Sequence, residues 1–215
     1  MTHWTTDPEG GRARGPRGLV RAWVEVLIRP RRFFANGTSP GDQAPALTFA
    51  AVVAAAYAIG WIVADPGVVP PIAESVVLSA VVVVLVVAAL AAPVGLHLTA
   101  AVATVSMIVA SVERDGDGDG DGGRGWGLTT RDRAGVSETV QVVAYASAPM
   151  ALAGPPIPEL RLVCGAYATV LLCLGVWTVH GTTPIRTLVG GLPPALFGYG
   201  VGYRVVAAAR TLFGG

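Results

Sequence analysis

Three polar residues and a proline share one face of a helix predicted to begin near residue 137. Glu138, Gln141, Tyr145 and Pro149 recur at three- and four-residue spacing, and no other formal charge follows until Glu159. This polar stripe could line a path for a small molecule or bind a partner, because polar groups inside a membrane mark functional sites. The same groups could instead form hydrogen bonds between helices and orient a bundle. We favour the second interpretation.

A histidine inside a long apolar run is a second candidate. His97 follows Pro93 by four residues, in a stretch with no formal charge between Glu74 and Glu113. Its ring could face a cavity together with the polar stripe, as a transporter would require. It could also bond a backbone carbonyl that the proline leaves without a donor, and we expect this structural role. His180, in contrast, is expected at a membrane interface in contact with water.

The known catalytic and metal-binding patterns are missing from the sequence. Cys164 and Cys173 are nine residues apart, which places them on opposite sides of one helix and excludes a disulfide between them there. Residues 115–121 alternate aspartate with glycine, like the opening of a calcium-binding loop, but the glutamate that should close the loop is absent. We therefore predict a solvated acidic loop over residues 113–133, no cofactor, no metal and no enzyme activity.

The elements that must hold the candidate residues are predicted to be membrane helices. The chain is 53% hydrophobic and 13% charged, with a mean hydropathy of +0.59, whereas soluble domains carry about 25% charged residues. A hydrocarbon core about 30 Å thick needs roughly 20 apolar helical residues. The uncharged runs predict an all-α, polytopic transmembrane helix bundle over residues 45–208, with spans at about 45–64, 75–112, 137–153, 160–180 and 187–207.

The second apolar run is long enough for two interpretations. It could form a hairpin that turns near Pro93, which gives six crossings, or one long helix bent there, which gives five. All fifteen basic residues are arginines. With the N-terminus inside, five crossings place twelve of them inside and leave Arg161, Arg204 and Arg210 outside, whereas six crossings give ten and five. The positive-inside rule favours five, although Arg204 and Arg210 run against it.

The N-terminal part is predicted to be a disordered tail over residues 1–16 and an amphipathic membrane-surface segment over residues 17–34. Its helix spans residues 17–28 and should end at Pro30, because the residue before a proline resists the α conformation. One helical face is apolar and leads into a basic, aromatic cluster, which suits the headgroup layer of the cytoplasmic leaflet. The alternative is that this face packs on loops of the bundle itself. The residues predicted to contact the membrane surface are Trp23, Arg29, Arg31, Arg32, Phe33 and Phe34.

Small residues in the last span suggest a packing surface. Gly198 and Gly202 are four residues apart, which allows helices to approach closely and would also permit self-association. Pro149, at the inner end of the polar stripe, is likewise expected to serve helix packing. Residues 209–215 are predicted to form a tail after the last span.

The order of these features resembles the Yip domain family, the Ypt/Rab-interacting polytopic membrane proteins, especially its prokaryotic and archaeal members. The resemblance covers residues 25–208. It implies five membrane helices, a cytosolic N-terminus and an outward C-terminus. It rests on Arg-Pro-Arg-Arg-Phe-Phe at 29–34, Leu-His-Leu-Thr-Ala at 96–100, Ser-Glu-Thr-Val-Gln-Val-Val-Ala-Tyr-Ala-Ser-Ala-Pro at 137–149 and Val-His-Gly at 179–181.

The resemblance also implies a function. Eukaryotic members are linked to small GTPases and to vesicle traffic or membrane shaping, but their Asp-Leu-Tyr-Gly-Pro type motif is absent from this chain. We therefore expect a non-enzymatic protein of the cell membrane that acts as a scaffold or in membrane organisation. Its partners would be the lipid bilayer and either other proteins or a second copy of itself, with no nucleic acid. The alternative is a small transporter or the membrane subunit of one.

Overall fold

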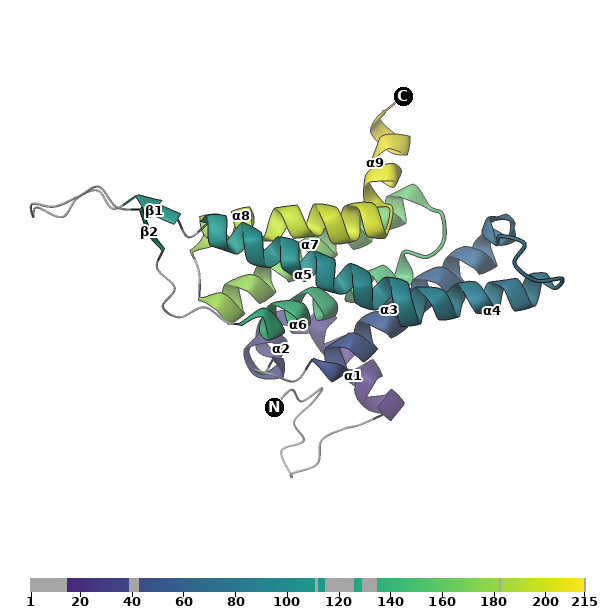
Figure 1. Ribbon diagram of the computed structural model, residues 1–215, viewed down its shortest axis with the longest axis horizontal. Helices are drawn as coiled ribbons and strands as arrows, with labels where there is room; N and C mark the ends of the chain where they lie inside the picture. Colours follow the sequence, from purple (N-terminus) through teal and green to yellow (C-terminus); the bar gives the residue numbers. More distant parts are fainter. Residues whose placement is uncertain are drawn as a thin grey trace, which may run out of the picture.

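The computed structural model describes residues 15–38, 43–110, 112–114, 126–128, 135–181 and 183–214. These residues form helices (Figure 1), apart from a small antiparallel hairpin of β1, Val112–Arg114, and β2, Trp126–Leu128. The predicted all-α class is thereby confirmed. The two strands of the hairpin flank the middle of the predicted acidic loop at 113–133. Most of that loop, and residues 1–14 of the predicted tail, lie outside the described residues.

The N-terminal region forms two helices, and the first one ends before Pro30 as predicted. Helix α1, Gly15–Ile28, is separated from α2, Pro30–Gly37, by Arg29, whose φ of −132° and ψ of 54° are not helical. The cause is Pro30, because the ring of a proline disfavours the α conformation of the residue before it. Both helices lie against one side of the bundle (Figure 1).

Three helices of the described residues are long and apolar enough to cross a membrane. They are α3, Ala44–Ala64, a continuous helix over Val76–Ala110, and α7, Pro158–His180. The continuous helix consists of α4, Val76–Val86, a π-helical turn η2, Val87–Ala91, and α5, Ala92–Ala110.

The continuous helix answers the question left open for the second apolar run. The hairpin interpretation is wrong, because the chain passes through Pro93 without turning back. A proline inside a helix removes one donor and crowds the preceding turn. The wider π turn directly before Pro93 accommodates that ring.

Two predicted spans are interrupted in the structure. Helix α6, Val136–Ala146, continues into a 3-10 segment η3, Ala148–Leu152, in which Pro149 lies near the start. Helix α8, Pro184–Ala195, continues into a second π-helical segment η4, Leu196–Gly202.

The end of the chain corrects the predicted last span and tail. The span stops at Gly202, and Arg204 takes the left-handed conformation with a φ of 60°. A separate helix α9, Val205–Phe213, then occupies most of the predicted tail. Because a left-handed residue changes the chain direction, α9 turns out of the line of η4 (Figure 1) and packs against α7.

Helix α6 lies at the centre of the core. Every residue from Glu138 to Ala146 is buried, and α6 packs against α3, α5 and α7. The outer surface, in contrast to this core, is apolar. In the most hydrophobic stretch of the Val76–Ala110 helix, only 6% of the residues are buried inside the protein. An apolar exterior around a core that contains polar groups suits lipid as the surrounding medium. The chain is therefore a membrane protein.

Candidate functional site

The polar stripe of α6 faces protein. Tyr145 and Gln141 are 0% exposed and Glu138 is 9% exposed. The amide of Gln141 donates from Nε2 to Ser137 Oγ at 3.4 Å, one turn earlier on the same helix. Pro149 is also buried, in η3. The stripe therefore runs through the packed interior of the bundle.

Aromatic rings enclose the inner part of the stripe. The Tyr145 ring meets Phe33 edge-on at a centroid distance of 4.9 Å and Phe49 at 5.1 Å. Phe33 and Phe34 are 5% and 1% exposed, which corrects the expectation that they contact lipid headgroups. Edge-to-face pairs stabilise beyond the area they bury. The α2 segment is therefore anchored in the core by these two rings.

A histidine at the end of α7 contacts the first turn of α6. His180 is 7% exposed, and its Nε2 lies 3.2 Å from Thr139 Oγ1. The prediction that water solvates His180 is therefore wrong. The sequence holds no signal for this contact, because the two residues are 41 positions apart and meet only when α6 and α7 pack together.

The structure does not bring His97 to the polar stripe. Its side chain is exposed on the outer face of α5, and Nδ1 lies 2.7 Å from the carbonyl oxygen of Pro93. Since a carbonyl oxygen only accepts, Nδ1 carries the proton and donates. His97 does bond a backbone carbonyl, but the acceptor is the carbonyl of Pro93 itself and not the carbonyl that the proline was expected to leave without a donor. Glu138, Gln141 and His97 do not share a cavity.

The apolar face of α1 packs on the bundle. Gly18, Ala22 and Val26 are buried, and Trp23 donates from Nε1 to the carbonyl oxygen of Ala148 at 2.9 Å. The hydroxyl of Tyr167 in α7 donates to the carbonyl oxygen of Leu27, which holds the end of α1 as well. Of the two interpretations of the amphipathic helix, this geometry matches packing on the protein itself.

The basic cluster after α1 remains at the surface. Arg29, Arg31 and Arg32 are exposed. The guanidinium of Arg31 lies 5.4 Å from the centre of the Trp177 ring near the end of α7. This cation–π contact ties α2 to α7 while the charge stays accessible. The arginines therefore remain candidates for contact with headgroups.

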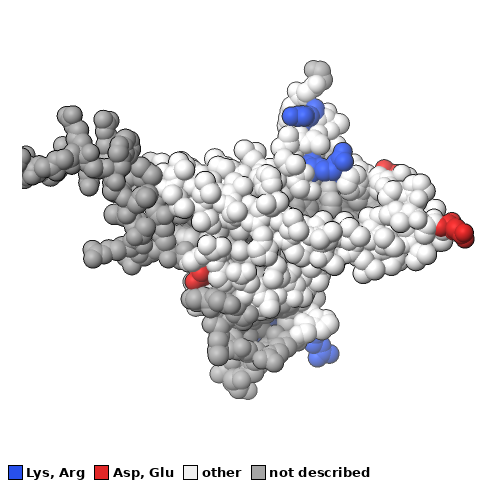
Figure 2. Space-filling model, viewed as in Figure 1, with Lys and Arg blue, Asp and Glu red and all other residues white. Residues whose placement is uncertain are grey.

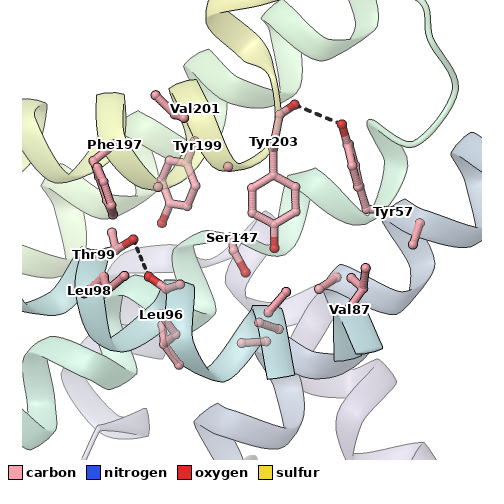
Figure 3. A pocket seen from close by; sticks show the side chains of 18 of the residues that line it. Tyr57, Val87, Leu96, Leu98, Thr99, Ser147, Phe197, Tyr199, Val201 and Tyr203 are labelled. Carbon is pink, nitrogen blue, oxygen red and sulfur yellow. Dashed lines mark hydrogen bonds between the residues drawn. The ribbon is translucent and has the colours of Figure 1, made fainter. Parts of the chain in front are cut away.

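An apolar cavity lies apart from the polar stripe. It has a volume of about 460 Å³ and lies between α3, the π turn η2 with the start of α5, and η4 (Figure 3). Tyr199 and Tyr203 enter it from η4, opposite Val87 and Leu96 (Figure 3). None of the stripe residues, nor His97, lines it.

Two of the phenol groups that line the cavity donate to the protein backbone. Tyr57 donates from Oη to the carbonyl oxygen of Tyr203 at 3.1 Å, and Tyr199 donates to that of Val143 at 3.0 Å. Because these hydroxyls are already bonded, the rings present their carbon faces to the cavity. The interior is therefore suited to an apolar occupant.

The two glycines of the last span differ in their surroundings. A Cβ at Gly198 would lie 2.7 Å from Cγ2 of Thr99, so this glycine allows η4 to approach α5 within the same chain. A Cβ at Gly202 would meet nothing within 4 Å, and Gly202 lines the cavity. The predicted close approach thus occurs inside the molecule at Gly198 only.

One end of the cavity meets a cluster of arginines and aromatic rings. Arg161 is buried and donates from Nε to the carbonyl oxygen of Ala153 at 3.1 Å and from Nη2 to that of Gly154 at 2.8 Å. Its guanidinium lies 4.8 Å from the centre of the Trp61 ring, and that of Arg204 lies 4.9 Å from the same ring. The only signal in the sequence was that these arginines fall outside in the five-crossing topology.

Comparison with known proteins gives one match. The family model described as the Yip1 domain matches residues 24–203. No curated protein and no solved structure shows significant similarity to the chain.

Proposed function

Because this chain belongs to the Yip1 domain family, we propose that it is a non-enzymatic, multi-pass protein of the cell membrane that organises the membrane or holds partner proteins as a scaffold. The burial of the α6 stripe carries the proposal. Gln141 and Tyr145 are closed off by helices and aromatic rings of the same chain. Polar groups used in this way hold membrane helices in a defined arrangement. A rigid bundle with an accessible N-terminal region suits a scaffold.

The proposed topology has five crossings, a cytoplasmic N-terminus and an outward C-terminus. The crossings are α3, the Val76–Ala110 helix, α6 with η3, α7, and α8 with η4. Contacts at the two ends support this order. At one end, the Arg31–Trp177 contact joins α2 to the end of α7, and the Thr139–His180 contact joins the start of α6 to the end of α7. The contacts of Arg161 and Arg204 with Trp61 join the end of α3, the start of α7 and the end of η4 at the other.

Cysteine labelling tests the topology. Asn36→Cys and Gly214→Cys would be introduced separately after Cys164 and Cys173 are replaced by alanine. With a membrane-impermeant maleimide on intact cells, we expect labelling of the cysteine at position 214 and labelling at position 36 only after permeabilisation. Labelling of both positions from the same side would exclude an odd number of crossings.

The outward side of α1 is the proposed contact surface for partners. Val20, Val24 and Ile28 are spaced by one helical turn and are 57%, 39% and 71% exposed. Next to them, Arg21 and Glu25 form an exposed ion pair with an Nε–Oε1 distance of 3.2 Å. A helix whose inner face is buried and whose outer face is still apolar offers a surface to another helix or to lipid.

Site-specific crosslinking distinguishes a protein partner from lipid. A photoreactive amino acid at Val20 is compared with one at Val163, which is 67% exposed on α7. In native membranes we expect a discrete protein adduct from position 20 and lipid adducts from position 163. Lipid adducts alone from both positions would contradict the scaffold role.

A further inference from the structure

The cavity has the size and lining of a site for a hydrocarbon chain. Its volume of about 460 Å³ falls within the range of small-molecule sites, which are mostly apolar. Valine, alanine and glycine residues from α3, η2 and α5 form one wall, and aromatic rings from η4 and the residue after it form the other (Figure 3). A chain of methylene groups would match this wall without leaving a polar group unsatisfied.

The cavity extends to the end of α3, where the arginines lie. Trp61, Ile62 and Val68 line it at this end, and so do Gly202 and Tyr203 from the end of η4. Arg204 follows directly and stacks on Trp61. In Figure 2 arginine side chains gather beside α9, and the surface is hollowed next to them. An occupant of the cavity would therefore have its polar end beside Arg204.

The charge at this end is not neutralised within the described part of the chain. Arg161 is bonded to backbone carbonyls, and the ion pair found among the described residues is Arg21–Glu25, at a distant site. Two guanidinium groups therefore flank one indole ring without a carboxylate in contact. Like charges held together are stabilised by an anion, and guanidinium binds phosphate oxygens in bidentate fashion.

We propose that this site binds one anionic phospholipid, with an acyl chain in the cavity and the phosphate against Arg204. The binding requires only that the chain is in a membrane, so it stands independently of the scaffold role. It also explains why these arginines are kept on the side that the positive-inside rule disfavours. The bound lipid would seal the gap between α3 and η4.

The contribution of the Arg204 charge to lipid binding is tested by native mass spectrometry of the purified protein with dioleoylphosphatidylglycerol. We expect one lipid per chain to stay bound. Arg204→Gln should lower the affinity about fivefold, the effect of one basic residue near an anionic headgroup. Arg210→Gln is the matched control, since Arg210 is also exposed but lies further along α9. Equal effects of the two variants would overturn the proposal, because they would indicate nonspecific attraction.

The role of the cavity in lipid binding is tested with variants whose larger side chains fill it. Gly95 lines the cavity, and a Cβ at this position would meet no neighbouring atom within 4 Å. Gly95→Phe should abolish retention of the lipid, and Gly202→Leu provides a second filling variant from the opposite wall. Val94→Phe, on a residue that is 51% exposed beside it, is the control. Undiminished binding in both filling variants would overturn the proposal.

Competition experiments test whether the site recognises the phosphate of a lipid or free inorganic phosphate. We expect dioleoylphosphatidylcholine to bind more weakly than dioleoylphosphatidylglycerol, because its headgroup carries no net charge. Inorganic phosphate should not displace the bound lipid, since most of the binding energy would come from the buried chain. Displacement by phosphate alone would overturn the proposal and indicate a phosphate site.

Discussion

The polar stripe of α6 and the cavity beside η4 both lie between helices of the bundle, but they differ in how tightly their side chains pack. Around α6, the rings of Phe33 and Phe49 meet Tyr145 edge-on, at centroid distances of 4.9 and 5.1 Å. Beside η4, the two π-helical segments η2 and η4 and small residues next to them line a cavity of about 460 Å³. Polar residues in this bundle therefore stabilise the structure, whereas the small residues and widened turns create room for a ligand.

The largest effect is expected from a substitution in the tightly packed region around α6. Tyr145→Ala should lower the free energy of unfolding by about 3–5 kcal/mol, because a large buried ring is lost and a void is left. Phe197→Ala is the matched control, since Phe197 is 41% exposed, and it should cost far less. Unfolding in mixed detergent micelles measures both. A similar loss in the two variants would show that the two regions do not differ in packing.

An intermediate effect is expected where η4, beside the cavity, approaches α5 closely. Gly198→Ala places a methyl group 2.7 Å from Thr99 Cγ2 and should cost about 1–3 kcal/mol through overpacking. Gly202→Ala meets open space and should leave the unfolding free energy within about 0.5 kcal/mol of the parent value. Thermal unfolding in detergent compares them. A larger loss for Gly202→Ala would contradict the assignment of the packed and open glycines.

The smallest effect concerns the hydroxyls around the cavity. Tyr57→Phe removes the donor to the Tyr203 carbonyl oxygen and should cost about 0.6 kcal/mol, the usual value for one hydrogen bond between membrane helices. Lipid retention should be unchanged, because this hydroxyl bonds to the backbone. A loss of lipid binding in Tyr57→Phe would place that hydroxyl in contact with the ligand. Unfolding and native mass spectrometry on the same sample separate the two outcomes.

The sequence was sufficient for features that depend on local composition. Uncharged runs located α3, the Val76–Ala110 helix and α7. The spacing of Glu138, Gln141 and Tyr145 could not show that the helix is buried on all sides from Glu138 to Ala146. The Yip family resemblance is confirmed by the match over residues 24–203. The count of five crossings stays a prediction, because α6 and α8 are short helices with irregular continuations.

Contacts between distant segments could not be read from the sequence. An aromatic pair beside arginines suits a membrane surface and a protein core equally well, and only the position of α2 against α7 decides where Phe33 and Phe34 lie. The same holds for Arg204, whose contact with Trp61 joins residues 143 positions apart. The cavity has no sequence signal either, because it depends on π-helical turns that widen the backbone.

The uninterrupted helix over Val76–Ala110 has a consequence for the surrounding bilayer. Its 35 residues span about 52 Å, far more than a hydrocarbon core of about 30 Å. Tilt alone would have to reach about 55°, beyond the range of about 0–40° seen for membrane helices. The mismatch must therefore be relieved by a locally thicker bilayer or by an end of the helix that leaves the hydrocarbon. In the first case the protein would sort into the thicker regions of a membrane.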